Sequence, residues 1–234
     1  MAFSETLTKH LSELGIASTP GQREALYRYY QMMVEYNEKV NLTAITDEDE
    51  AALLHMADSA ALLPHLGHAR SLADIGTGAG FPGMVMAILR PDLEVTLVDS
   101  LKKRVLFLES CKESLGLGNV HALHLRAEEG GRMPKLREAF DAATARAVAS
   151  LPVLLEYCLP YVRVGGAFYA LKGKDAQSEL AASQHALATL GGGDAHCDKV
   201  KLSGLEHHII AIKKIKNTPK AYPRKAGTPA KNPL

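Results

Sequence analysis

Apolar residues recur at helical spacing through the first part of the chain. In the first run Leu7 and Leu11 lie one turn apart, a second run covers about residues 20–34, and a third covers about residues 47–66. None of these runs alternates between apolar and polar residues as a half-buried strand does. We therefore predict a helical extension over residues 1–68.

The pattern changes after Arg70, where short apolar stretches alternate with longer helical patterns. The short stretches have the length and composition of strands: SLADI, EVTLVD, NVHALHL, FDAATA and GGAFYALKG. Strands that alternate with helices predict βαβ units and a doubly wound, mainly parallel sheet in an α/β core over residues 69–216. Two last runs, centred on residues 196–202 and 209–215, have no helix between them, so we expect an antiparallel hairpin that completes the sheet.

The last residues, 217–234, contain four prolines and are predicted to lack regular structure. They belong to a longer segment in which every charged side chain is basic: Lys213, Lys214, Lys216, Lys220, Arg224, Lys225 and Lys231. Because clustered charge of one sign is typical of nucleic-acid contact, we expect this tail to bind RNA. The alternative is a solvated, disordered end.

The overall composition narrows the class of protein without identifying a partner. Of 234 residues, 47% are apolar and 23% charged, which is typical of a folded protein, and the net charge is only +1. The three cysteines are scattered without a CxxC pair, so we expect a reducing compartment and no structural zinc. We find neither a secretory signal nor an apolar stretch long enough for a membrane span. These features predict a cytoplasmic protein. We also expect it to be a monomer.

The sequence DIGTGAGFPG, from Asp74 to Gly83, is the strongest local feature. It follows a predicted strand and precedes a predicted helix, and its glycines allow a sharp turn close to a ligand. An acidic residue followed by GxGxG favours a methyl-donor site that includes Asp74, Gly76 and Gly78. A dinucleotide-binding site is one alternative. In its GxGxxG motif the first glycine directly follows the strand, and when Gly76 is taken as that glycine, Phe81 stands at the position of the third glycine. The other alternative is a tight strand–helix turn that binds no ligand.

Two further strand ends carry groups suited to a nucleoside. Asp99 ends the second strand, where a carboxylate can accept hydrogen bonds from both ribose hydroxyls. After the third strand, Ala127 or Glu128 can meet the adenine edge. Ligands of open α/β sheets bind at the carboxyl ends of the strands, so these groups are expected to converge. The alternatives are a helix cap for Asp99 and a solvated helix start for Glu128.

At this point the sequence resembles a known family, the glucose-inhibited division protein B family of guanine-N7 methyltransferases that act on small-subunit (16S) ribosomal RNA. The resemblance runs nearly end to end and rests on these segments: YNEKVNLTAI, HMADSAAL, DIGTGAGFPG, VDSLKKRVLFL, RAE, TARAVASL, ALKG and YPRKAGTPAKNPL. It departs from the family at Tyr36, where members often carry Trp, and at His207 and His208, where a basic side chain is expected nearby.

The resemblance implies the class I methyltransferase fold, with a seven-stranded sheet, and S-adenosylmethionine as co-substrate. It implies that the acceptor is a guanine N7 in the 530-loop region of 16S RNA, met as free RNA or in the small subunit. The resemblance assigns eight residues to the donor site, including those of the glycine turn: Asp74, Gly76, Gly78, Phe81, Asp99, Ala127, Glu128 and Arg146. Competing hypotheses are a methyltransferase for another RNA or a small molecule, and a binding module without turnover.

Arg146 follows the fourth strand, where the acceptor must enter. A guanidinium there can orient guanine O6 or clamp a phosphate, and a structural ion pair is the alternative. Lys172, after the fifth strand, is expected to contact RNA with Arg224, Lys225 and Lys231, although Lys172 can equally be a solvated lysine.

No general base is expected, because N7 of guanine has a free lone pair and no proton to lose. Catalysis is then alignment of the acceptor with the methyl carbon, and no residue is assigned a proton-transfer role. His55 and Asp58 lie three residues apart on a predicted helix, but two ligands without a third do not make a metal site. We therefore expect no metal.

Overall fold

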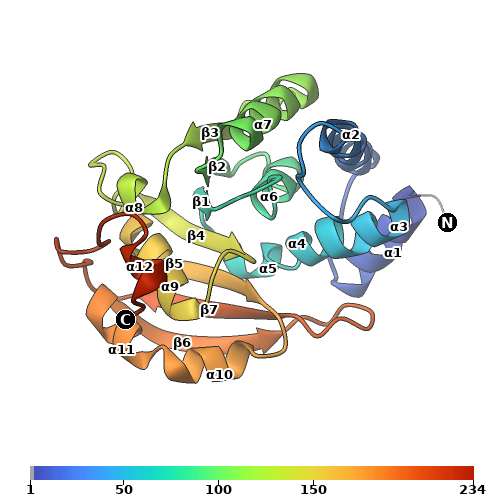
Figure 1. Ribbon diagram of the computed structural model, residues 1–234. Coiled ribbons are helices and arrows are strands. Elements are labelled where there is room, and N and C mark those ends of the chain that lie inside the picture. Colours follow the sequence, from blue (N-terminus) through green and yellow to red (C-terminus); the bar gives the residue numbers. More distant parts are fainter. Residues whose placement is uncertain (1–2) are drawn as a thin grey trace.

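The computed structural model describes residues 3–234, which build a seven-stranded sheet with the order β3–β2–β1–β4–β5–β7–β6 (Figure 1). The strands are β1 (Ser71–Ile75), β2 (Glu94–Asp99), β3 (Val120–His124), β4 (Phe140–Arg146), β5 (Val162–Lys172), β6 (Gly192–Lys199) and β7 (His208–Lys214). Strands β1 to β5 are parallel, and β7 is antiparallel to both β5 and β6. The predicted doubly wound α/β fold is confirmed.

Two apolar clusters cover the two faces of this sheet. Successive side chains of a strand point to opposite faces, so Leu97 belongs to one cluster and Val98 to the other. On one face lie α6 (Gly83–Leu89) and α7 (Lys102–Leu115). The helices on the other face are α8 (Ala127–Gly130), α9 (Leu151–Cys158), α10 (Ala176–Ala182) and α11 (Gln184–Leu190), with a short 3-10 turn at Leu159–Tyr161.

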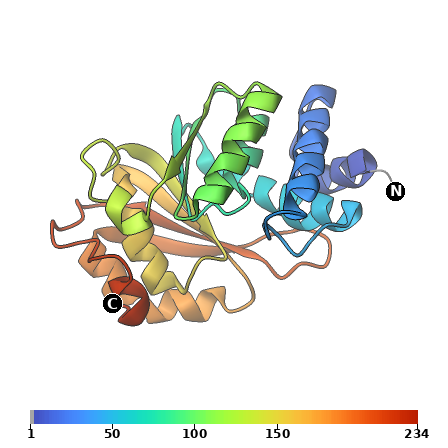
Figure 2. The same ribbon diagram turned by 45° about the horizontal axis from the view of Figure 1, so that its top comes forward.

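The N-terminal extension packs onto the α6–α7 face. It consists of α1 (Phe3–Glu13), α2 (Pro20–Asn37), α3 (Glu48–Glu50), a π-helical segment (Ala51–Ala57), α4 (Asp58–Ala60) and α5 (Leu63–Leu66). Thr19 begins α2 with a capping box: its hydroxyl accepts the Gln22 N–H, and the Gln22 side chain accepts the Thr19 N–H. Helix α2 lies beside α7 (Figure 2), and the extension shares one apolar cluster with the core.

The predicted hairpin exists, but its first strand lies earlier in the sequence than expected. Strand β6 ends at Lys199, and the apolar residues Val200 and Leu202 leave the sheet to pack in the cluster that contains the extension. The Ser203 hydroxyl donates a hydrogen bond to Glu13 of α1. The apolar pattern of this segment therefore serves contact with the extension, not the sheet.

The basic C-terminal segment is folded onto the protein. Lys214, within β7, is fully buried, and its ammonium donates to Leu159 O and Thr218 Oγ1, each at 2.6 Å. Burial lowers the pKa of Lys214 to about 8. Beyond it, a short helix α12 (Thr228–Lys231) begins with Pro229 in its first turn, where proline is tolerated. The expectation that residues 217–234 lack regular structure was wrong for these four residues.

Candidate active site

Two pockets open next to each other at the carboxyl edge of the sheet. The strand-end pocket, of about 500 Å³, is lined by residues at or after the ends of β1, β2, β3 and β4, by Tyr157 of α9 and by two residues of the C-terminal segment. Its walls include Gly76, Asp99, Leu101, Ala127, Glu128, Val148, Tyr157, Gly227 and Ala230. The Arg146 pocket, of about 470 Å³, is bounded by the extension, β4, β5 and the β6–β7 hairpin. Its walls include His55, Asp58, Arg146, Lys172 and His207.

The glycine turn forms the floor of the strand-end pocket. Gly76 and Gly78 have φ values of +69° and +62°, a region that favours glycine. A Cβ at Gly76 would lie 2.7 Å from Val148 Cγ2, so only glycine lets the loop after β4 approach this closely. The turn therefore brings the ends of β1 and β4 into contact.

Asp99 presents a fixed carboxylate to the same pocket. Its Oδ1 accepts the Leu101 N–H at 2.8 Å, its Oδ2 accepts the Gly78 N–H at 2.9 Å, and Arg104 lies 3.5 Å away. A carboxylate offers about four acceptor positions. Asp99 thus holds the glycine turn and still has capacity for hydroxyl groups of a ligand.

Ala127 and Glu128 form the wall beyond β3. The Glu128 side chain is nearly buried, and its Oε1 accepts the Gly227 N–H at 2.7 Å. The Ala127 carbonyl accepts a hydrogen bond from the Tyr161 hydroxyl at 2.8 Å. The acid after the third strand therefore binds the C-terminal segment, a contact that the sequence analysis did not foresee.

Asp74 shapes the turn from beneath and does not line the pocket. Its Oδ2 accepts hydrogen bonds from the Thr77 hydroxyl at 2.7 Å and from the Gly83 N–H at 2.8 Å. Its Oδ1 is buried and has no hydrogen-bond partner among residues 3–234. Burial raises the pKa of Asp74 to about 6, against the hydrogen bonds from Thr77 and Gly83, which lower it.

Phe81 lies behind Arg146, not in the strand-end pocket. The Phe81 ring stacks on His55 with 4.5 Å between ring centroids, and the Arg146 guanidinium lies 5.0 Å from the Phe81 centroid. A guanidinium over an aromatic face is attracted by the ring. Phe81 therefore holds the arginine side chain and the π-helical segment in place.

Arg146 is the centre of the second pocket. Its Nη1 donates to Leu54 O at 3.1 Å and to Asp58 Oδ2 at 3.2 Å. Asp58 Oδ1 in turn lies 2.7 Å from His207 Nδ1. Asp58 is nearly buried, and its hydrogen bond raises the pKa of His207. Three distant parts of the chain thus meet in one charged cluster.

His55 completes this cluster as a neutral side chain. Burial, and then the Arg146 charge, lowers the pKa of His55 to about 4. The neutral ring can accept at Nδ1 from Arg146 Nη2, 3.4 Å away, and donate at Nε2 to Thr43 Oγ1, 2.8 Å away. The sequence signal for this role is weak, because the contacts join residues far apart in the chain.

The two pockets share one residue, Ala147. It has a φ of +54°, which is unusual for a residue with a side chain. Arg146 lines one pocket and Val148 the other, so this segment of the β4–α9 loop separates them. The two pockets therefore adjoin at Ala147.

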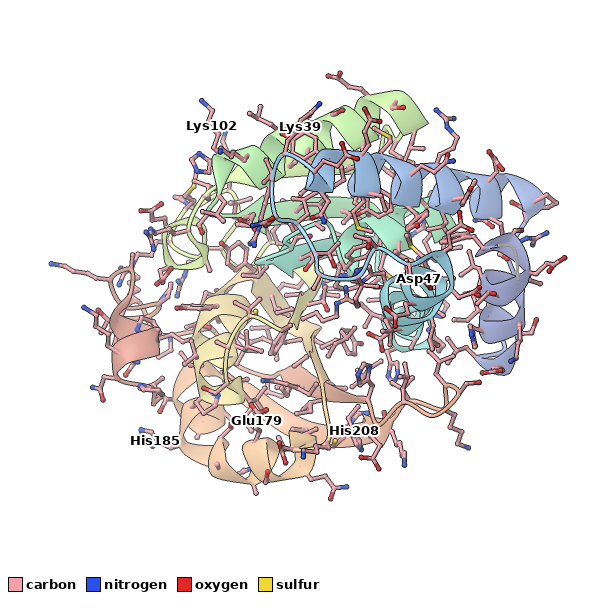
Figure 3. The ribbon with its side chains drawn as sticks, turned by 45° about the vertical axis from the view of Figure 1, so that its right-hand side comes forward. Lys39, Asp47, Lys102, Glu179, His185 and His208 are labelled. Atoms are coloured by element: carbon pink, nitrogen blue, oxygen red, sulfur yellow. The ribbon has the colours of Figure 1, made fainter. Side chains whose placement is uncertain are left out.

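Of the four predicted RNA contacts, two are engaged within the protein. Lys172 Nζ donates to Ala149 O at 2.7 Å and to Glu179 Oε2 at 2.8 Å, at the end of the sheet where Figure 3 shows Glu179 and His208. The Arg224 guanidinium binds Glu156. The structure gives these two cations intramolecular partners, and we therefore revise our interpretation of them.

Lys225 and Lys231 are exposed, as an RNA contact requires. Further exposed lysines that the sequence analysis did not select are Lys39, after α2, and Lys102, at the start of α7 (Figure 3). The Tyr36 hydroxyl binds the backbone of the neighbouring Lys103, so these two parts of the surface adjoin. No local signal distinguished these lysines from other solvated charges.

Among residues 3–234, no group of three or more His, Cys, Asp or Glu side chains is placed to hold a metal ion. None of the helices described is long and apolar enough to cross a membrane.

Comparison with solved structures agrees with the fold. An S-adenosylmethionine-dependent O-methyltransferase from Thermotoga maritima matches 80% of this chain and 73% of its own, with a TM-score of 0.51 and 14% identity. A 16S rRNA (adenine(1408)-N(1))-methyltransferase from Catenulisporales acidiphilia matches 63% of this chain and 89% of its own, also with a TM-score of 0.51 and 14% identity. The predicted class I methyltransferase fold is confirmed.

Sequence comparison identifies the family. The family model for rRNA small subunit methyltransferase G matches residues 22–210. Curated relatives named Ribosomal RNA small subunit methyltransferase G include one from Clostridium botulinum, 46% identical over the full length of both chains, and one from Bacillus subtilis, 47% identical over 98% of each. The chain therefore belongs to the rRNA small subunit methyltransferase G family.

Proposed function

We propose that this protein transfers a methyl group from S-adenosylmethionine to N7 of a guanine in small-subunit 16S ribosomal RNA. The observation that carries the proposal is the meeting of two pockets at Ala147, one with nucleoside-binding groups and one with a held guanidinium. The names of the curated relatives support the RNA substrate.

The strand-end pocket fits the donor. Asp99 keeps free acceptor positions for the ribose hydroxyls, and the backbone at Gly76 allows close approach where a side chain would clash. Ala127 and Glu128 lie at the adenine end of the same wall. S-adenosylmethionine supplies a methyl group on a sulfonium, which is already activated for transfer. The task of the protein is to hold it toward Ala147.

The Arg146 pocket fits a guanine whose N7 points toward Ala147. The Hoogsteen edge of guanine presents N7 and O6, both hydrogen-bond acceptors. Arg146 is fixed by Asp58, His55 and Phe81, so its donors are oriented before the base arrives. It can orient O6 while N7 stays free to react. Because N7 carries no proton, no residue has to remove one.

On methylation the positive charge moves from the sulfonium of the donor to the guanine ring. The Asp58 carboxylate lies within the same cluster, and Lys172 is neutralised by Glu179. The wall of the Arg146 pocket therefore contains carboxylates as well as cations.

RNA approaches across exposed lysines on the surface around the pockets. We assign phosphate contact to Lys225, Lys231, Lys39 and Lys102, all solvent-exposed. Lys172 and Arg224 instead hold parts of the protein together. The protein acts as a monomer in the cytoplasm, on 16S RNA or on the small subunit that contains it.

Labelled methyl transfer to small-subunit ribosomal RNA, followed by mapping of the modified base, tests the proposal. We expect one 7-methylguanine in 16S RNA and none with the Arg146→Ala variant. Transfer to another position or to a small molecule alone would contradict the proposed substrate. Absence of transfer with both free RNA and small subunits would contradict the proposed activity.

A further inference from the structure

The C-terminal segment, residues 217–234, runs across α8 and α9 and ends beside the strand-end pocket. Figure 1 shows its helix α12 next to both of these helices. Two of its residues, Gly227 and Ala230, line the pocket together with Asp99 and Tyr157. A segment whose charge suggests an RNA tail is thus part of the wall of a small-molecule site.

The strongest anchor of this segment is the ion pair between Arg224 and Glu156. Arg224 Nη2 lies 2.6 Å from Glu156 Oε2, and its Nε lies 2.9 Å from Oε1. The Arg224 backbone N–H also donates to Glu156 Oε1, at 2.7 Å. The Glu156 carboxylate is only 1% exposed, so Arg224 provides the charge that offsets its burial. Arg224 is therefore committed to the fold and not free for phosphate.

Two residues between α8 and β4 hold the start of the C-terminal segment by hydrogen bonds. Arg137 donates to Thr218 O at 2.6 Å and to Tyr222 O at 2.9 Å. Glu138 accepts the Thr218 N–H at 2.7 Å. Leu234 at the other end packs against the apolar cluster under α9. The segment is pinned at both ends, which fixes the part between them.

Glu128 joins the part of the C-terminal segment that lies beside the pocket to the core of the protein. Its Oε1 accepts the Gly227 N–H at 2.7 Å, and Gly227 has a φ of +79° that favours glycine. One helical turn further, Ala230 also lines the pocket. Ala226 is exposed, as Ala230 is, but it does not line the pocket.

We propose that residues 224–231 form a fixed wall of the donor site, in which Gly227 and Ala230 face the bound nucleoside and Arg224 is the positioning residue that holds the wall in place. This inference rests on the proposed function, because it takes the strand-end pocket as the site of S-adenosylmethionine. Its consequence is that the basic segment sets affinity for the donor, whereas contact with RNA falls to its exposed lysines.

The first test compares Phe at two exposed alanines. Ala230→Phe places a ring in the pocket, and Ala226→Phe places the same ring outside it. The ring would occupy space that the bound nucleoside needs, so Ala230→Phe should weaken S-adenosylmethionine binding roughly ten- to hundredfold. Ala226→Phe should bind like the parental protein. Calorimetry with S-adenosylmethionine and thermal unfolding of both variants provide the readouts.

The second test compares two cations that are neighbours in sequence. Arg224→Ala and Lys225→Ala each remove one positive charge, but only Arg224 anchors the wall. We expect Arg224→Ala to weaken donor binding about tenfold or more, since it leaves Glu156 unpaired, and Arg224→Lys to restore part of it. Lys225→Ala should leave donor affinity unchanged and weaken RNA binding instead.

The two proposals fail in different ways. If the parental protein binds S-adenosylmethionine and Ala230→Phe binds it equally well, the wall is overturned and the proposed function stands. Equal losses of RNA affinity in Arg224→Ala and Lys225→Ala, with donor affinity unchanged in both, would also overturn the wall and restore the RNA-tail interpretation. If the parental protein binds no S-adenosylmethionine, the proposed function itself is overturned.

Discussion

Asp58 and Arg146 are 88 residues apart in sequence, and their side chains form an ion pair with Nη1 3.2 Å from Oδ2. Both groups are largely withdrawn from solvent, and His207 holds the other carboxylate oxygen. The pair sets the direction in which the guanidinium points into its pocket. It also binds the N-terminal extension to β4.

Arg146→Lys should separate a role toward the acceptor from one toward the donor. Lysine keeps the charge but loses the planar fork that contacts Asp58 and Leu54. We expect methyl transfer to fall roughly ten- to hundredfold, which corresponds to loss of one or two oriented hydrogen bonds. Donor affinity, measured by calorimetry, should stay unchanged, because Arg146 lines the other pocket. A matching loss of donor affinity would return Arg146 to the donor site.

The pKa of His207 should lie above the ordinary value of a histidine, because the hydrogen bond to the Asp58 carboxylate stabilises the protonated form. Asp58→Asn should return the pKa of His207 toward its usual value, which NMR of the imidazole protons measures. The protonated form stabilises the fold at pH values below the unfolded pKa. That contribution is lost as the pH rises through the folded pKa. An unchanged His207 titration in Asp58→Asn would show that the contact is not made in solution.

Asp74 should make the protein less stable as the pH rises from about 4 to about 6. Its pKa is raised from 3.8 to about 6, so in this range the unfolded chain loses the proton while the folded protein keeps it. The difference amounts to about 3 kcal/mol of unfolding free energy. Asp74→Asn should remove this pH dependence in urea unfolding curves, whereas Asp194→Asn, at an exposed carboxylate, should leave it in place.

Asp99 should determine donor affinity through the ribose hydroxyls. Hydrogen bonds to a charged group are worth about 1.5–3 kcal/mol, so Asp99→Ala should bind S-adenosylmethionine roughly ten- to hundredfold more weakly. Asp99→Asn keeps one acceptor oxygen and should lie between Ala and the parental protein. Because Asp99 also accepts the Gly78 N–H, thermal unfolding must accompany the calorimetry. Equal affinity in all three proteins would remove Asp99 from the site.

The strand ends and the glycine turn were predictable because local patterns determine them. Buried parallel strands are short apolar runs, and a turn such as that at Gly76 requires glycine. The convergence of Asp99 and Glu128 on one pocket follows from the geometry of a parallel sheet. Their assignment to the donor stays a prediction.

Contacts between distant residues were not predictable in the same way. Nothing in the sequence near Arg224 indicates that Glu156, 68 residues earlier, takes its charge, so charge clustering alone suggested RNA contact. The π-helical segment that carries His55 has the same apolar pattern as an α-helix. The placement of Phe81 beneath Arg146 likewise depends on how the extension packs.

The Arg146 pocket is lined by residues between 45 and 58, by residues 146–147 and 171–173, and by residues between 200 and 209. The strand-end pocket is lined by residues between 75 and 157 and by residues 227 and 230. Each pocket is therefore lined by several segments that lie far apart in the chain. During synthesis, a growing chain that contains only β1, β2 and β3 still lacks the residues of the strand-end pocket that follow β4 and those of the C-terminal segment. A growing chain that stops just before residue 227 therefore contains all seven strands of the sheet but lacks part of the wall of the strand-end pocket.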